Sequence, residues 1–286
     1  MKVAKARYLK FRLRIQKRDK DILHLIHRFR LVTIGQIHKI LFSNQKRISC
    51  YRRVRMLESQ GYLRRHGLTY GAQNFYLITL KGLLTIGKTD QALENKGQNQ
   101  RVYNHQIPHD LGLVDIFCAL STLSDKITYK TENEIRAELE RSHPYDKYLI
   151  PDALMMVKEP LKLNLAIELE LNIQSPKRYE ERFYLMTKDL KTVYDKYLYV
   201  FENINYRNFF IKQLIKNKQQ LLLENILFVE LDLLVNQPFD CPIYTGKGKS
   251  FTFRELFKRF NDAVAHTPLI PPLYGNKDDK EKNTTT

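Results

Sequence analysis

Hydrophobic and polar positions divide the chain into two regions with different patterns. In the first region Ile22, Leu25, Ile26 and Phe29 recur with the spacing of one helix face, which predicts a helix over residues 21–30. In the second region apolar residues alternate with polar ones at a period of two, or form short unbroken stretches, as they do in β-strands. The pattern therefore predicts a mainly helical region followed by a mixed α/β region.

Cap signals complete the first region. Thr33 and Gln36 have the spacing of a capping box, so they predict the start of a second helix. Ser43 or Asn44 is a candidate cap for a third helix, and Gly61 is expected to end it. Two short strands around a turn-rich segment follow. Three helices and a two-stranded wing predict a winged-helix domain.

The second region predicts the larger of the two domains. A helix over residues 108–123 precedes three strands, of which the first is expected over residues 127–136. A helix that begins at Ser175 and Pro176 precedes a further strand, helix and strand. This order predicts an α/β (α+β) domain. The expected organisation is a basic arm (1–18), a winged helix (19–88), a linker (89–104), the α/β domain (105–265) and a disordered tail (266–286).

The positive charge of the chain is confined to its first third. Residues 1–88 contain 21 of the 48 Lys and Arg residues but only 3 of the 31 acidic residues, so their net formal charge is +18. The rest of the chain has a net charge of −1. Such asymmetry favours a nucleic acid or an anionic membrane as the partner of the basic part, and neutralised phosphates release counterions that add affinity.

The third predicted helix and the first wing strand contain the candidate DNA contacts. A helix-turn-helix places this helix in the major groove of duplex DNA. The candidates are Lys46, Arg47, Arg52, Arg53, Arg55, Arg64 and Arg65. A winged helix also serves as a protein-interaction module, but the charge of +18 favours double-stranded DNA.

Composition and missing motifs exclude several other classes. Cys50, Cys118 and Cys241 are far apart and odd in number, which argues against a disulfide framework and for a reducing, cytoplasmic setting. No signal peptide is visible and no apolar stretch is long enough for a membrane span, so neither a secreted protein nor a membrane partner is expected. It also lacks HExxH, phosphate-loop and GxGxxG motifs, so zinc hydrolysis and nucleotide binding have no support.

Three carboxylates carry the strongest chemical signal. Asp152 follows Pro151 at the start of a strand, and Glu168 with Glu170 lies on one face of the next strand. An antiparallel hairpin would place Asp152 opposite the two glutamates. Carboxylates crowded in this way repel one another unless a cation neutralises them, and their oxygens suit Mg²⁺ or Mn²⁺. The alternative is a set of solvated acids on an exposed sheet face.

Neighbouring residues are weaker candidates for the same site. Glu134 is a possible fourth ligand, although a surface acid is the commoner role. His109 can line the site from its helix or serve the structure only. Tyr179 is a possible nucleophile, but an aromatic residue on an amphipathic helix more often belongs to the core.

Pro151-Asp152 on one strand and Glu168-x-Glu170 on the next resemble the PD-(D/E)XK restriction-endonuclease-like fold over residues 105–235. The resemblance implies that Asp152 and Glu168 bind a divalent metal. It also implies a lysine where this chain has Glu170, and Lys177 is a candidate substitute for that lysine.

The whole chain resembles the replication-relaxation group, and within it the restriction-endonuclease-like conjugative relaxases of the MobC class. This resemblance implies a Mg²⁺- or Mn²⁺-dependent, strand-specific nicking endonuclease with Asp152, Glu168, Glu170 and Lys177 as catalytic residues. It implies action at a plasmid transfer origin, with mobilisation or coupling proteins as further partners. The alternatives are a non-catalytic DNA-binding regulator of replication or transcription, and a nuclease associated with restriction or transposition.

Overall fold

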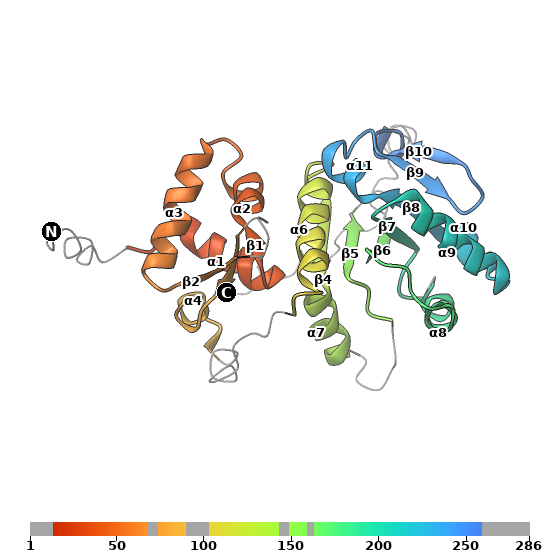
Figure 1. Cartoon of the computed structure of the whole chain (residues 1–286), viewed down its shortest axis with the longest axis horizontal. Coiled ribbons are helices and arrows are strands. Elements are labelled where there is room, and N and C mark those ends of the chain that lie inside the picture. Colours follow the sequence, from red (N-terminus) through yellow and green to blue (C-terminus); the bar gives the residue numbers. More distant parts are fainter. Residues whose placement is uncertain are drawn as a thin grey trace, which may run out of the picture.

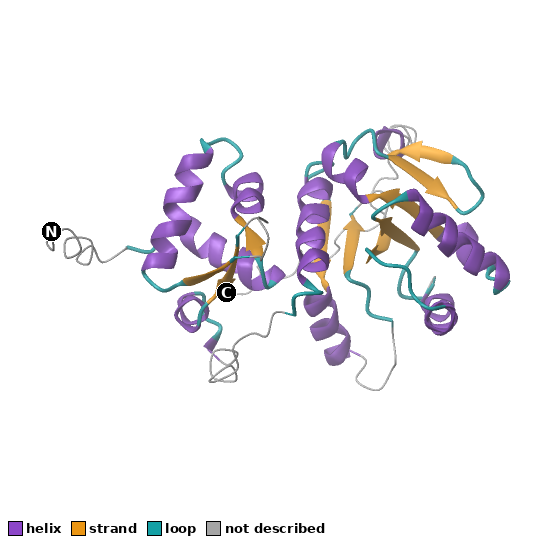
Figure 2. Ribbon diagram, in the orientation of Figure 1, coloured by secondary structure: helices purple, strands orange, loops and turns teal. Residues whose placement is uncertain are grey.

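The chain forms two adjoining units in a computed structural model, which describes residues 14–67, 74–89, 103–142, 149–158, 163–190 and 192–258 (Figure 1). The N-terminal unit comprises the described residues from 14 to 89. The sheet unit comprises those from 103 to 258, in which helices lie on both sides of the strands (Figure 2). Most of the predicted arm, most of the linker and the whole tail lie outside the described residues.

The N-terminal unit contains four described helices and a small antiparallel sheet. The strands are ordered β1-β3-β2, and Val32 of β1 lies opposite Tyr76 of β3. The elements are α1 (Lys17–Phe29), β1 (Val32–Thr33), α2 (Ile34–Leu41), α3 (Arg47–Ser59), β2 (Leu63–His66), β3 (Phe75–Ile78) and α4 (Leu80–Thr85).

The sheet unit is built on one mixed sheet with the strand order β10-β9-β8-β7-β6-β5-β4. Neighbouring strands from β4 to β6 are antiparallel, β6, β7 and β8 are parallel, and β9 and β10 add an antiparallel hairpin. The elements are α6 (Ile107–Ser121), β4 (Ile127–Thr131), α7 (Glu132–Ser142), β5 (Ala153–Val157), β6 (Leu163–Glu170), α8 (Pro176–Asp189), β7 (Lys196–Phe201), α9 (Ile204–Lys216), α10 (Gln220–Asn225), β8 (Ile226–Glu230), α11 (Leu231–Asn236), β9 (Pro242–Thr245) and β10 (Ser250–Thr252).

Alternate residues of β6 enter two different cores. Leu165, Ile167 and Leu169 pack on the side of α6, whereas Ala166 packs among the aromatic residues of β7, α8 and α9. The approach of α6 to the sheet depends on Gly112, because a Cβ there would lie 2.7 Å from Leu169 Cδ2. The sheet is therefore buried on both faces, as its runs of apolar residues require.

The two units share one hydrophobic core. Buried residues of α1, α2 and α3 belong to the same cluster as residues of α6 and of the sheet. At the contact, Gln36 Nε2 donates to the carbonyl of Leu111 at 3.0 Å, and Arg28 Nε donates to both carboxylate oxygens of Glu134 at 3.0 Å. Because burial is shared, the N-terminal unit is held in a fixed position against α6.

Several local predictions are confirmed. Thr33 caps α2 through a capping box with Gln36, Ser175 caps α8, and β5 pairs with β6 as an antiparallel hairpin. Gly61 follows α3 with a φ of 76°, a conformation in which glycine carries little strain.

Other boundaries were predicted wrongly. The strand expected over residues 127–136 ends at Thr131, where the Glu134 carboxylate accepts the backbone N–H of Thr131 at 2.8 Å and so turns the chain into α7. Neither Ser43 nor Asn44 caps α3, because both lie in a turn closed by a bond from the Gln45 N–H to the Phe42 carbonyl at 2.8 Å. The first helix also begins earlier than predicted, and α4, α10, α11, β9 and β10 were not predicted.

Within the described part of the chain, no helix is both long and apolar enough to cross a bilayer.

Candidate functional site

Asp152 lies at the start of β5, where the sheet meets α6. Its Oδ2 accepts the backbone N–H of Leu169 at 2.8 Å and contacts Nε2 of His109 at 3.2 Å. The side chain is 22% exposed. Burial disfavours the charge of Asp152, but the hydrogen bond and charge of His109 outweigh it, so the pKa of Asp152 is lowered. Asp152 is therefore a fixed carboxylate that remains ionised at neutral pH.

His109 connects Asp152 to a second acid. Its Nδ1 lies 3.7 Å from Oδ1 of Asp110, on the opposite side of the ring from Asp152. Burial lowers the pKa of His109, but the hydrogen bonds and charges of the two aspartates raise it to about 10. The imidazole is thus protonated at neutral pH and places one positive charge beside Asp152.

Glu168 lies deeper in the sheet unit, on the face covered by α8. Its side chain is 2% exposed and forms an ion pair with Nη2 of Arg182. Its Oε2 contacts this guanidinium, whereas its Oε1 is buried without a hydrogen-bond partner. Burial raises the pKa of Glu168 to about 8, against the opposing charge of Arg182 and with the added repulsion of nearby Asp152. One guanidinium therefore does not fully stabilise the charge of this carboxylate.

Glu170 occupies the end of β6 and has a different partner. Its Oε1 accepts a hydrogen bond from the hydroxyl of Tyr179, which is itself fixed by the backbone N–H of Gln174 at 3.1 Å. Burial raises the pKa of Glu170 to about 7, although the Tyr179 hydroxyl favours its charged form. Tyr179 is buried in the aromatic core, which agrees with the structural alternative for this residue.

The three carboxylates thus lie in the same part of the fold, but each has a protein partner of its own. Among the described residues, no three His, Cys, Asp or Glu side chains come together closely enough to hold a metal ion. Two of the carboxylates do fit one: Mg²⁺ is commonly bound by one or two carboxylates, with waters and substrate phosphates as the other ligands. Glu168, with its unpartnered Oε1, and the neighbouring Asp152 form such a pair.

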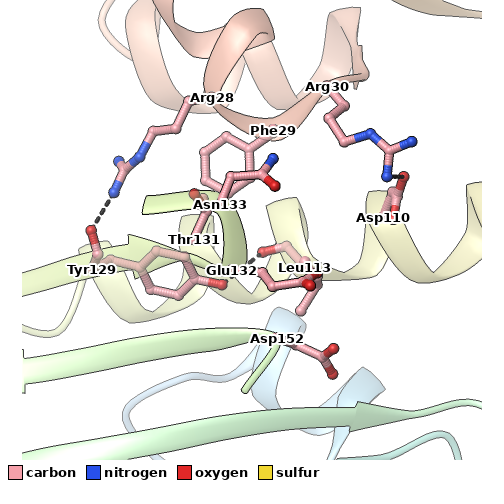
Figure 3. A pocket seen from close by; sticks show the side chains of 10 residues that line it. All are labelled: Arg28, Phe29, Arg30, Asp110, Leu113, Tyr129, Thr131, Glu132, Asn133 and Asp152. Atoms are coloured by element: carbon pink, nitrogen blue, oxygen red, sulfur yellow. Dashed lines mark hydrogen bonds and ion pairs between the residues drawn. The ribbon is translucent and has the colours of Figure 1, made fainter. Parts of the chain in front are cut away.

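A cavity of about 50 Å³ leads from the N-terminal unit to Asp152 (Figure 3). Arg28 and Arg30 line it from the end of α1, and Asp110 lines it from α6. Arg30 has a φ of 68°, unusual for a residue with a side chain, and its Nη1 lies 3.7 Å from Oδ2 of Asp110. Charged contacts therefore run from Arg30 through Asp110 and His109 to Asp152.

The predicted DNA contacts have different environments. Most of them lie on the surface formed by α3 and β2, which we call the basic face; its exposed members are Lys46, Arg47, Arg52, Arg64 and Arg65. Ile48 and Tyr51 are exposed beside them, at 49% and 45%. Arg55 and Arg65 both contact Glu58, at 2.7 and 3.5 Å.

Arg53 differs from its neighbours. Its guanidinium forms a two-pronged ion pair with Asp19, which is completely buried at the start of α1. The side chain of Arg53 is 19% exposed. This arginine therefore joins α3 to α1 and has little guanidinium surface left for a phosphate.

The other predicted site residues lie apart from the carboxylates or have structural partners. Lys177 is exposed in the first turn of α8, whereas the cation that contacts Glu168 is Arg182. Glu134 is bound by Arg28 and caps α7, so it serves the contact between the units.

Sequence reasoning missed Arg182. A signal was present, because Arg182 lies on the same helical stripe as Tyr179, Phe183 and Met186, all of which are buried. A cation at a core position of an amphipathic helix indicates a buried anionic partner.

Comparison with known proteins shows which family the chain belongs to. The sequence model described as replication-relaxation matches residues 23–183, a stretch that includes the second half of α1, the basic face, α6, all three carboxylates and Arg182. No curated protein and no solved structure matches the chain. Because the family match covers more than half of the sequence, the protein belongs to the replication-relaxation family.

Proposed function

We propose that this protein is a relaxase: a divalent-metal-dependent endonuclease that nicks one strand of duplex DNA at a plasmid transfer origin. Membership of the replication-relaxation family indicates a role in plasmid replication or relaxation and an interaction with DNA. The observation that carries the nuclease proposal is the pair of neighbouring carboxylates Asp152 and Glu168: Asp152 is partly exposed and ionised, and the charge of buried Glu168 is only partly compensated by Arg182.

The order of elements supports a restriction-endonuclease-like core. The chain runs through α6, β4, α7, the antiparallel hairpin of β5 and β6, α8 and then β7; β4 is antiparallel to β5, and β7 is parallel to β6. In that order the two acids of the resembled motif fall on β5 and β6, where Asp152 and Glu168 lie. The N-terminal unit has the helix and strand order of a winged helix, with α3 in the position of the recognition helix.

The chain's own residues prepare the site for a phosphodiester. The N–H of Leu169 and the imidazolium of His109 fix Asp152, and Arg182 holds Glu168. Asp152 and Glu168 would hold Mg²⁺ or Mn²⁺, which would lower the pKa of the attacking water and stabilise charge on the phosphate. We assign Glu170 a supporting role, because its carboxylate is bound by Tyr179.

The basic face would bring the DNA to this site. Its cations lie in the part of the chain that carries a net charge of +18, so phosphate contacts should dominate affinity there. Because the two units share a core, DNA bound on α3 has a fixed position relative to Asp152. We propose that site selection depends on the N-terminal unit and cleavage on the sheet unit.

The test is nicking of supercoiled plasmid with Mg²⁺ or Mn²⁺, with and without the cognate transfer origin. Asp152→Asn and Glu168→Gln should each reduce nicking by about 100-fold or more, because each removes a ligand with little change in shape. Glu181→Gln is the matched control: this acid is exposed on α8, next to Arg182, and its loss should leave nicking unchanged. Equal nicking by all three variants would contradict the proposal.

A specific observation also supports a non-catalytic DNA-binding regulator. Glu170 replaces the motif lysine, and Lys177 is exposed on α8. If this second proposal holds, the parent protein will bind duplex DNA with steep salt dependence but will neither bind Mn²⁺ in calorimetry nor nick any plasmid.

A further inference from the structure

Arg182 is the cation of α8 that contacts Glu168, and its surroundings are unusual. Its guanidinium pairs with Glu168 and lies over the ring of Tyr199, 5.9 Å from the ring centroid. The side chain keeps 26% of its surface exposed, although its Nε is buried. Arg182 therefore extends from the aromatic core towards the surface beside the candidate site.

Two polar atoms at this point lack partners. Nε of Arg182 has no acceptor and Oε1 of Glu168 has no donor, whereas Oε2 of Glu168 pairs with Nη2 of Arg182. Buried polar groups are almost always paired, so such atoms call for a ligand or water. The donor and the acceptor lie on contacting side chains but do not satisfy one another. A ligand that carries both signs of charge, such as a phosphodiester with its divalent cation, would satisfy both.

The charge of Arg182 reaches all three carboxylates. It favours the ionised forms of Asp152, Glu168 and Glu170, whereas His109 faces Asp152 from the other side. The negative neighbours in turn keep Arg182 protonated. The site therefore contains a permanent positive charge, although Glu170 occupies the position at which the resembled motif has a lysine.

We propose that Arg182 is a catalytic residue that supplies the positive charge of the missing lysine, by contacting a non-bridging oxygen of the scissile phosphate. In the free protein Arg182 forms an ion pair with Glu168. When DNA and the cation bind, Glu168 would become a ligand of the cation, and Arg182 would contact the phosphate instead. The inference rests on the proposed nuclease function and deepens it.

The chemistry differs from that of a lysine in one respect. A guanidinium stays protonated, so Arg182 does not remove the proton of the attacking water. In hydrolysis a water oxygen bonds to phosphorus and the water releases a proton to solvent, while the phosphorus–oxygen bond to the leaving sugar breaks and that oxygen takes up a proton from solvent. Arg182 stabilises the charge that the phosphate oxygens gain during this exchange.

The experiment compares Arg182→Gln and Arg182→Lys with the parent, and uses Lys188→Gln, a change at an exposed lysine of the same helix, as the control. We would measure Mn²⁺ binding by calorimetry, duplex affinity, melting temperature and nicking rates at saturating DNA. Arg182→Gln should reduce the nicking rate by about 100-fold or more without weakening duplex affinity. It should bind Mn²⁺ more tightly than the parent, since Glu168 no longer has a competing partner. Arg182→Lys should recover part of the rate, and Lys188→Gln should match the parent.

Each other outcome has a definite meaning. Nicking by Arg182→Gln at the parental rate overturns the inference and leaves the nuclease proposal standing. If Arg182→Gln lowers the melting temperature and abolishes both Mn²⁺ binding and nicking, and Arg182→Lys restores none of these, the role of Arg182 is structural and the inference is overturned. The inference is also overturned if the parent binds Mn²⁺ without nicking and Arg182→Gln binds Mn²⁺ no more tightly than the parent. A parent that neither binds Mn²⁺ nor nicks retires the nuclease proposal itself.

Discussion

Arg52 and Arg53 are neighbours on α3, yet the structure predicts that replacing each with alanine will have opposite consequences. Arg52 is exposed on the basic face, whereas Arg53 is paired with Asp19. Arg52→Ala should weaken duplex binding and leave stability nearly unchanged. Arg53→Ala should lower the free energy of unfolding of the N-terminal unit and leave the DNA affinity of the folded protein nearly unchanged.

The magnitudes follow from burial. Asp19 is 0% exposed, and without Arg53 its carboxylate keeps the backbone N–H of Gln16 as a donor, at 2.7 Å. Removing one partner of a buried ion pair costs about 3–5 kcal/mol, a large part of the roughly 5–15 kcal/mol that stabilises a typical domain. An exposed substitution such as Arg52→Ala changes stability by about 0.5 kcal/mol or less. If Arg52 contacts a base edge, its loss should reduce affinity by about 1–3 kcal/mol.

Chemical denaturation followed by circular dichroism and duplex binding at fixed salt would measure both effects. The double variant Asp19→Ala/Arg53→Ala provides the control, because its destabilisation should be smaller than the sum of the two single changes. The reasoning is refuted if Arg53→Ala is as stable as the parent, or if it weakens DNA binding as much as Arg52→Ala while remaining folded.

Three further predictions concern the contact between the units and the packing of α6. Asp115 lies on α6 beside Gln36 and Lys39 of α2, and burial raises its pKa against their opposing effects, so its charge costs stability above that pKa. Asp115→Asn should therefore raise the melting temperature at pH 8, and the gain should shrink as the pH falls towards 4. Arg28→Ala removes the ion pair to α7 and should lower the free energy of unfolding by about 1–3 kcal/mol, with faster amide exchange in α1 and α7 as a second readout. Gly112→Ala should cost about 1–3 kcal/mol in denaturation, because its Cβ meets Leu169 at 2.7 Å.

The helix starts show what local signals can and cannot predict. Thr33 and Gln36 form a capping box that can be read directly, because the two residues that satisfy each other are three apart. Thr131 and Glu134 have the same spacing, yet the alternating residues before them favoured a longer strand. The competing strand pattern concealed a signal that was equally local.

The sequence by itself determined the order of most helices and strands, the antiparallel hairpin that brings Asp152 to Glu168, and the concentration of positive charge before residue 89. Each of these depends on periodicity or on composition, which neighbouring residues define. Only the tertiary structure decided that Arg53 serves Asp19, that His109 faces Asp152, and that Arg182 rather than Lys177 contacts Glu168. These pairs join residues on different elements, and the choice between adjacent cations depends on which one the packing of α3 or α8 turns towards a buried carboxylate.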